Sequence, residues 1–215
     1  MPLIGDHAPE FHAMTTQGKI DFPADYKGSW VVLFSHPADF TPVCTTEFIA
    51  LSRMNETFES LNTKLIGLSI DSLHSHLGWI KSIEALNFNN EGKVKIPFPI
   101  IADISMNVAK KYGMLQTVAN TQTVRAVFII DPEGIIRTIL YYPMSTGRNI
   151  PEIIRILQSL QLNDKTHYST PANWQPGDAV VMGAPLTIEE AQERLESSDN
   201  TIKPLDWYLT MKKMK

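Results

Sequence analysis

The sequence of 215 residues contains a single cysteine, Cys44. An internal disulfide needs two cysteines, so the fold must hold together without one, which suits a reducing cytosol. A chain of this length can bury a core large enough to need no covalent staple.

Long apolar runs and a large excess of one charge are also missing. No apolar stretch approaches the roughly 20 residues that cross a bilayer, and the opening string MPLIGDHAPEF lacks the basic and apolar regions of a signal peptide. Nineteen basic and 23 acidic residues give a net charge of −4, which offers no electrostatic basis for binding nucleic acid or an anionic membrane. We therefore expect a soluble, cytoplasmic protein with no nucleic-acid or membrane partner.

Glycine patterns that bind phosphate or dinucleotides are absent from the sequence. His74 and His76 form an H-x-H pattern, but no third or fourth ligand lies near them in the chain. We expect these two histidines at a solvated helix start, and no metal site.

Short apolar runs rich in β-branched residues are what the chain does contain. They are nearly continuous, which is typical of strands buried on both faces of a sheet. They are Trp30–Ser35, Leu65–Ile70 and Ala126–Ile130. The turn sequence DPEG at Asp131–Gly134 leads into IIRTILYY, which predicts a hairpin. Helical segments are predicted between and after the strands, at Glu47–Leu61, Ser75–Leu86, Asn107–Tyr112 and Ile150–Leu160. This alternation predicts an α/β fold with a mixed central sheet.

The pattern changes after Leu162, where the chain becomes rich in Pro, Asn, Asp and Gly. It keeps one strand candidate, Ala179–Met182, and one helix that Thr187 and Glu190 would open as a capping box. We expect a domain over residues 1–162 and an extension over residues 163–215. The extension has too little apolar material for its own core, so it should pack on the domain or on a partner subunit.

Cys44 lies where a strand gives way to a helix. The predicted strand ends at His36-Pro37, and the helix begins within TPVCTTEF, so Cys44 falls near the first helical turn. Free N–H groups and the helix dipole favour an anion there, and a cysteine in such a place ionises more readily into the nucleophilic thiolate. The alternative is a buried apolar filler, the usual state of a free cysteine. The proline and threonine setting at a helix start favours the reactive thiol.

Thr41 stands three residues before Cys44, where thioredoxin-like oxidoreductases keep the first cysteine of C-x-x-C. Its hydroxyl could hydrogen-bond a thiolate and an oxygen-rich substrate, or could cap the helix. Pro37-x-x-x-Thr41-x-x-Cys44 resembles the active-site signature of the peroxiredoxins. The longer string SHPADFTPVCTTE resembles their one-cysteine, peroxiredoxin-6-like subfamily, as do Arg125 in TVRAVFIIDPEG and Arg148 in TGRN.

This resemblance implies a thioredoxin-like fold with helices on both faces of the sheet, and a thiol-dependent peroxidase that needs no metal or organic cofactor. It implies that Cys44 attacks a hydroperoxide and becomes a sulfenic acid, and that Thr41 holds the peroxide. Pro37 would shield the thiolate, and Arg125 would stabilise first the thiolate and then the breaking O–O bond. From the residues alone, Arg125 could equally be a surface ion-pair partner.

Two further residues have supporting roles in this reading. His36 would tune the pocket or serve the strand end structurally, and Arg148 would hold the surroundings of Arg125. With no second cysteine, the sulfenic acid needs an external thiol reductant, either a thioredoxin-like protein or a small thiol. The family also forms homodimers and larger rings such as decamers.

Two other functions compete with the peroxidase. One is an oligomeric holdase chaperone or structural assembly protein on the same fold. The other is a lipid hydrolase that would use Ser29. The stretch Lys27-Gly28-Ser29-Trp30-Val31 lacks both outer glycines of the G-x-S-x-G nucleophile turn, so we expect no phospholipase activity.

Overall fold

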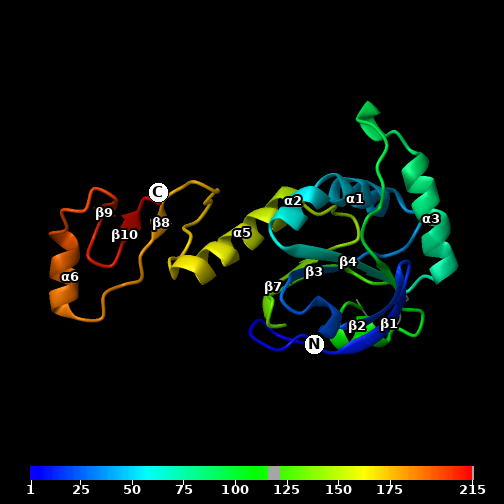
Figure 1. Ribbon diagram of the computed structural model, residues 1–215, viewed down its shortest axis with the longest axis horizontal. Coiled ribbons are helices and arrows are strands. Elements are labelled where there is room, and N and C mark those ends of the chain that lie inside the picture. Colours follow the sequence, from blue (N-terminus) through cyan, green and yellow to red (C-terminus); the bar gives the residue numbers. More distant parts are fainter. Residues whose placement is uncertain (116–121, 215) are drawn as a thin grey trace. The chain divides into compact units, whose positions relative to one another are not determined.

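The computed structural model describes residues 1–115 and 122–214, which form two compact units, Met1–Ile150 and Pro151–Lys215 (Figure 1). The sequence places the boundary after residue 162, whereas the structure divides at the start of helix α5 (Ile150–Thr166). The reason is that α5 bonds to the segment that follows it. Arg155 donates to the carbonyl of Trp174 at 3.3 Å, and the hydroxyls of Ser159 and Thr170 lie 2.6 Å apart.

A seven-stranded mixed sheet forms the centre of the N-terminal unit, as predicted. Its strand order is β2-β1-β5-β4-β3-β6-β7. The strands are β1 (Phe11–Thr15), β2 (Gly18–Phe22), β3 (Trp30–Ser35), β4 (Thr63–Ser69), β5 (Ile100–Ala102), β6 (Arg125–Ile130) and β7 (Ile136–Tyr142). The central strands β3, β4 and β5 are parallel, and the remaining neighbours are antiparallel.

The predicted hairpin is β6–β7, and its turn is closed by the Gly134 N–H, which donates to the Asp131 carbonyl at 2.9 Å. Gly134 has φ +84°, which a side chain would strain. Strand β3 has its predicted bounds. The β1–β2 hairpin was not predicted, because polar residues interrupt both strands. Strand β5 was not predicted either, because its apolar run is only three residues long and directly follows Pro99.

In the described part of the N-terminal unit, before α5, there are four α-helices and two 3₁₀ turns. They are α1 (Pro42–Arg53), α2 (Asn55–Ser60), α3 (Leu73–Ala85), α4 (Asn107–Tyr112), η1 (Ala24–Tyr26) and η2 (Phe88–Asn90). Helix α4 has its predicted bounds, and α3 matches Ser75–Leu86 within two residues. The prediction of one helix over Glu47–Leu61 was wrong. Helix α1 begins at Pro42, whose fixed φ suits the first helical position, and a break at Met54 separates it from α2.

Helices α1 and α3 pack on one face of the sheet through aromatic side chains. Phe48 of α1 lies 5.5 Å from Phe34 of β3 and 4.6 Å from Trp79 of α3, measured between ring centroids. Gly67 of β4 makes room for these rings, because a Cβ there would lie 3.3 Å from Phe48 and 3.4 Å from Phe34. This packing fixes α1 against the end of β3.

Helix α4 covers the opposite face of the sheet. Its Tyr112 packs edge-on against Phe128 of β6, with ring centroids 5.1 Å apart. Phe128 pairs across the sheet with Leu33, the neighbour of Phe34, so it points to the other side. The fold is therefore α/β with helices on both faces, as expected of a thioredoxin-like protein.

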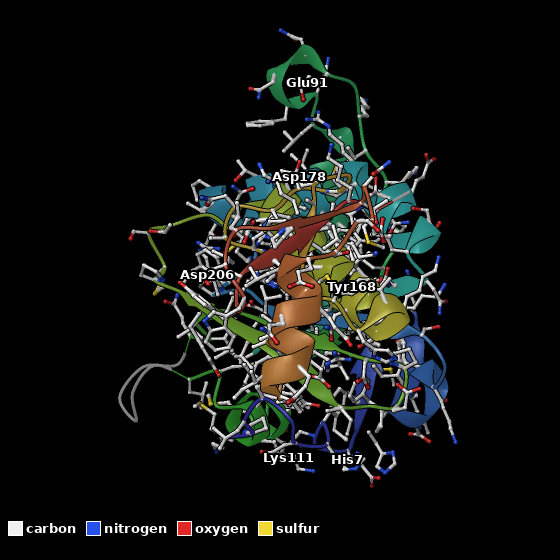
Figure 2. All side chains as sticks on the ribbon, turned by 90° about the vertical axis from the view of Figure 1, so that its left-hand side faces the viewer. His7, Glu91, Lys111, Tyr168, Asp178 and Asp206 are labelled. Carbon is white, nitrogen blue, oxygen red and sulfur yellow. The ribbon has the colours of Figure 1, made fainter. Side chains whose placement is uncertain are left out.

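The C-terminal unit contains α5 and a small three-stranded antiparallel sheet of order β8-β10-β9. Its other elements are β8 (Val180–Val181), α6 (Ile188–Leu195), β9 (Ile202–Pro204) and β10 (Thr210–Lys212). The Thr187 hydroxyl accepts the Glu190 N–H at 3.1 Å and caps α6, as predicted. The Glu190 carboxylate accepts the N–H of Leu186, one residue before the position that a capping box requires. Tyr168, labelled in Figure 2, lies under the Lys212 ammonium at 6.0 Å. Throughout residues 1–115 and 122–214, no helix has the length and apolar character needed to span a membrane.

Candidate active site

Cys44 occupies the first turn of α1 and has no solvent-exposed surface. The sulfur therefore lies in an enclosed site and not in an open cleft. Thr41 takes the N-cap position, yet its hydroxyl does not cap the helix; it donates to the Ala38 carbonyl at 2.8 Å. The lone pairs of that oxygen can therefore accept a further hydrogen bond.

Arg125, the first residue of β6, is 3% exposed and faces the sulfur. Its Nη1 lies 3.2 Å from Sγ of Cys44 and 2.8 Å from Oε2 of Glu47. Its Nε and Nη2 donate to the Met144 carbonyl at 3.0 and 2.8 Å. The reading of Arg125 as a surface ion-pair partner was therefore wrong. A cation held here stabilises negative charge on sulfur strongly, because little water screens it.

Glu47 is a member of the site that the sequence reading did not identify. It is 3% exposed, and its Oε2 also accepts from Arg148 Nη2 at 2.6 Å. Its Oε1 accepts from the Arg148 backbone N–H at 2.9 Å and Nε at 3.0 Å. One carboxylate thus holds both buried guanidinium groups in place. The sequence did contain a sign of this role: Glu47 is an acidic residue about one helical turn after Cys44, and the two arginines assigned to the site need a counterion.

Arg148 joins three elements at the base of the site. Its Nη1 donates to the carbonyls of Ser35 at 3.0 Å and Ala126 at 3.2 Å, the C-terminal end of β3 and the start of β6. Its guanidinium lies over the Phe34 ring at 5.1 Å. Arg148 shares Glu47 with Arg125, an arrangement consistent with the supporting role that remains a prediction.

Pro37 and His36 follow β3 and are both buried. The His36 backbone is fixed at both groups, since its N–H donates to the Leu68 carbonyl at 2.9 Å and its carbonyl accepts the Thr123 hydroxyl at 2.6 Å. Its side-chain Nε2 lies 2.8 Å from Oδ1 of Asp39.

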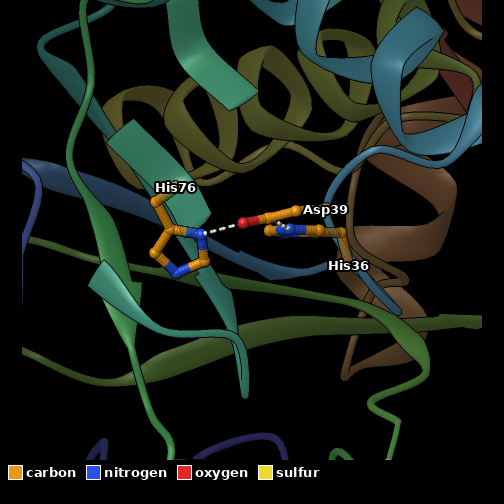
Figure 3. Close-up of side chains that lie close together, drawn as sticks. All are labelled: His36, Asp39 and His76. Atoms are coloured by element: carbon orange, nitrogen blue, oxygen red, sulfur yellow. Dashed lines mark hydrogen bonds and ion pairs between the residues drawn. The ribbon is translucent and has the colours of Figure 1, made fainter. Parts of the chain in front are cut away.

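His76 corrects a second prediction. We expected it at a solvated helix start, but its side chain has no exposed surface. Its Nδ1 lies 2.8 Å from Oδ2 of Asp39 (Figure 3). Its Nε2 lies 3.1 Å from the Ile101 carbonyl. His76 stands three residues before Trp79 and seven before Ile83, and this helical spacing places it on the buried face of α3.

The two histidines set the charge state of Asp39. Burial by itself raises the pKa of this carboxyl, but hydrogen bonds from His36 and His76 outweigh burial and hold the pKa well below its ordinary range. Burial lowers the pKa of His36 despite its bond to Asp39. Asp39 is therefore ionised at neutral pH, whereas His36 is neutral.

His36, Asp39 and His76 also present ligand atoms within 4.8 Å of one another, as a metal site would. A metal on Nε2 of His36 would put the ring proton on Nδ1, which has no hydrogen-bond partner among the described residues. Metal-bound histidines nearly always bond through their second nitrogen, and a buried unpaired N–H is costly. With the proton on Nε2, only a lone pair is left unpaired. The cluster therefore fits a hydrogen-bond network better than a metal ion.

Among the described residues, the Ser29 hydroxyl bonds to an amide oxygen and not to a histidine. Its hydroxyl lies 3.4 Å from Oδ1 of Asn62. It lines a cavity of about 210 Å³, and the described residues around that cavity include no histidine. A serine nucleophile requires an adjacent general base, so the geometry gives no support to a hydrolase at Ser29.

Comparisons with known proteins identify the family. Residues 4–139 match the family model of the AhpC/TSA family, and residues 159–198 match the C-terminal domain of 1-Cys peroxiredoxin. A peroxiredoxin of Methanosarcina mazei is 58% identical over 99% of this chain and 98% of its own length. A peroxiredoxin of Aquifex aeolicus is 47% identical, over 100% and 98%.

Solved structures give the same result. A yeast mitochondrial 1-Cys peroxiredoxin superposes with a TM-score of 0.86 at 41% identity, covering 100% of both chains. A cysteine-to-serine variant of peroxiredoxin 6 from Arenicola marina superposes with a TM-score of 0.84 at 36% identity, again covering 100% of both. Together with the lone Cys44 beside a buried arginine, these matches show that the chain belongs to the peroxiredoxins, of the one-cysteine kind, and is a thiol-dependent peroxidase.

Proposed function

We propose that Cys44 is the nucleophile of this peroxidase. Its thiolate attacks the terminal oxygen of a hydroperoxide, so an S–O bond forms while the O–O bond breaks. The electron pair of the O–O bond goes to the leaving oxygen, which takes a proton and departs as water or an alcohol. The observation that carries this assignment is the 3.2 Å approach of Arg125 Nη1 to Sγ.

Thr41, Arg125 and Pro37 assist this step. The Thr41 hydroxyl donates its hydrogen to the Ala38 carbonyl. Its oxygen is therefore left to accept a hydrogen bond from the O–H of the peroxide. The Arg125 N–H groups stabilise the thiolate and then the charge that develops on the leaving oxygen. Pro37 is buried in the loop between β3 and α1, and in this proposal it keeps water from the sulfur.

An external thiol completes the cycle. The sequence has no second cysteine, so a thiol reductant attacks the Cys44 sulfenic acid, water leaves and a mixed disulfide forms. A second thiol then releases Cys44 and the oxidised reductant. The work on the yeast mitochondrial relative describes thiol resolution through glutathione/thioredoxin systems, which supports a thioredoxin-like protein or a small thiol here.

The C-terminal unit supports self-association. Leu186 and Ile188 are 93% and 78% exposed, and Trp207 and Leu205 add further exposed apolar surface. Apolar surface of this kind marks interfaces, so the proposed assembly is a homodimer, which could assemble further into a ring such as a decamer. Analytical ultracentrifugation tests the assembly: the parent should sediment as a dimer or larger, and a Leu186→Glu, Ile188→Glu variant as a smaller species.

The proposed location of the protein is the cytoplasm.

The catalytic proposal is tested by Cys44→Ser with hydrogen peroxide and dithiothreitol. The variant should consume no peroxide above the buffer rate. A variant that consumed peroxide at the parent rate would place the chemistry elsewhere. The holdase alternative is not favoured, because the related proteins are peroxiredoxins along the whole chain.

A further inference from the structure

Asp39 is held from three sides, and among the described residues none of its hydrogen bonds goes to Cys44 or Thr41. Its two carboxylate oxygens each lie 2.8 Å from a histidine, His36 at the end of β3 and His76 on α3 (Figure 3). Its backbone N–H donates to Oδ2 of Asp71, in the loop after β4, at 3.0 Å. The side chains of Asp39 and both histidines are at most 1% exposed. This clamp fixes the loop between β3 and α1 against two other elements.

The hydrogen-bond partners of His76 indicate which of its ring nitrogens carry hydrogen. The Ile101 carbonyl can only accept, so His76 Nε2 at 3.1 Å carries a hydrogen. His76 Nδ1 faces an ionised carboxylate and also donates. Both ring nitrogens of His76 therefore face oxygen acceptors. A buried pair of this kind is weak evidence for stability alone, so its place beside the active-site loop calls for another role.

The backbone between Asp39 and Thr41 shows what the clamp does. Phe40 adopts a left-handed conformation, with φ 54°, while its side chain is 61% exposed. For a bulky residue this conformation is unfavourable and persists only where the surroundings impose it. The clamp imposes it on one side, and the bond of the Thr41 hydroxyl to the Ala38 carbonyl at 2.8 Å imposes it on the other.

We propose that Asp39 and His76 are positioning residues of the peroxidase reaction. They hold the loop that aims the Thr41 hydroxyl at the place where a hydroperoxide meets Cys44. Neither residue touches the substrate. The inference rests on the proposed function, because it takes Thr41 as the group that receives the peroxide.

Two rates separate positioning from general support of the fold. The second-order rate of Cys44 with hydrogen peroxide, measured by competition with catalase, depends on Thr41. The rate at which iodoacetamide alkylates Cys44 depends on the reactivity and access of the sulfur, but not on the binding of a peroxide at Thr41. Asp39→Ala and His76→Phe should lower the peroxide rate about 30-fold or more. Alkylation should stay within about threefold of the parent or become faster, since the loop is looser.

A conservative variant should rescue the clamp. In Asp39→Asn, the amide oxygen can accept from Nε2 of His36 while the amide nitrogen donates to Nδ1 of His76. Both hydrogen bonds to the histidines are therefore kept. Its peroxide rate should stay within about fivefold of the parent. Asp131→Ala is the matched control: this buried carboxylate accepts N–H groups of Glu133 and Ile135 in the β6–β7 turn, and its loss should spare the peroxide rate.

Three results would overturn the inference: a folded Asp39→Ala or His76→Phe protein with the parent peroxide rate, equal falls in both rates, or Asp39→Asn as slow as Asp39→Ala. Should the disruptive variants not fold, His76→Gln decides. It keeps one donor for Asp39 and drops the bond to Ile101, so a fall of about fivefold supports the clamp, and an unchanged rate refutes it. Thr41→Val is measured alongside. An unchanged rate there contradicts the role of Thr41, whereas a slow Thr41→Val beside a normal Asp39→Ala contradicts the clamp alone.

Discussion

Nη1 of Arg125 lies 3.2 Å from Sγ of Cys44, although 81 residues separate the two in the chain. The sheet brings them together. Strand β6 pairs antiparallel with β3, and Phe34 lies opposite Val127, so the start of β6 lies at the end of β3, where the chain turns into α1. The contact between sulfur and guanidinium is therefore fixed by strand register and does not depend on a mobile loop.

Replacing Arg125 should slow attack on peroxide without stopping it. Arg125→Met removes the donors that face the sulfur and the leaving oxygen, and loss of one such donor costs about 10²–10³ in rate. Arg125→Lys should retain only part of the rate. Its ammonium keeps the positive charge, but it cannot reach Cys44, Glu47 and the Met144 carbonyl together. Stopped-flow measurement of the peroxide rate checks both variants, and a parent-like rate in Arg125→Met would contradict the assigned role.

Thr41 should act through its hydroxyl oxygen. Thr41→Val keeps the shape but loses both the bond to the Ala38 carbonyl and the acceptor for the peroxide, so the peroxide rate should fall about 100-fold. Thr41→Ser keeps the oxygen and should stay within about tenfold of the parent. The ratio of kcat/KM for hydrogen peroxide between these two variants is the measurement. Equal rates in the two would show that the hydroxyl has no part in the reaction.

Glu47→Gln should destabilise the fold and slow the reaction together. The amide cannot satisfy two guanidinium groups, so Arg125 and Arg148 are left with buried charge that lacks its counterion. Breaking a buried pair in this way costs about 3–5 kcal/mol. Urea unfolding measures the loss, and a peroxide assay should show a fall of about tenfold.

The control for this variant is Lys95→Ala, which removes a salt bridge to Glu84 at a lysine side chain that is 87% exposed. An exposed pair contributes at most about 1 kcal/mol. If Glu47→Gln cost no more than this control, the buried carboxylate would not be the anchor of the two arginines.

Stability should fall between pH 7 and pH 5 in a way that depends on His36. Burial lowers the pKa of His36 in the folded protein, so the unfolded chain binds a proton near pH 6.5 that the folded chain does not. Below that pH, stability decreases by up to about 1.4 kcal/mol per pH unit. The Asp39 pKa is shifted downward, so its contribution is present above about pH 4 and is lost only below that pH.

Urea unfolding of the parent and of His36→Gln across this range measures the effect. Glutamine can still donate to Asp39 but does not titrate, so the pH slope of the variant should be smaller by about one proton. Identical slopes would mean that His36 is not held neutral in the folded state.

The sequence predicts the parts of this site that depend on local order. Strand β3, the turn after it and the helix carrying Cys44 follow from adjacent residues, and the family resemblance supplies Thr41, Pro37 and Arg125. Glu47 and Asp39 were missed because their partners come from distant segments, Arg148 lying 101 residues from Glu47 and His76 lying 37 residues from Asp39. His76 was misplaced because, with no further metal ligand near H-x-H, both histidines were assigned to a solvated helix start, although the spacing of His76 to Trp79 and Ile83 already indicates a buried helix face.

Mass spectrometry of the parent after one equivalent of hydrogen peroxide, with dimedone present to trap sulfenic acid, tests the central claim most directly. The account predicts one dimedone adduct, located on Cys44, and its loss when the reductant is added before the trap. Consumption of peroxide with Cys44 recovered as an unmodified thiol would contradict it.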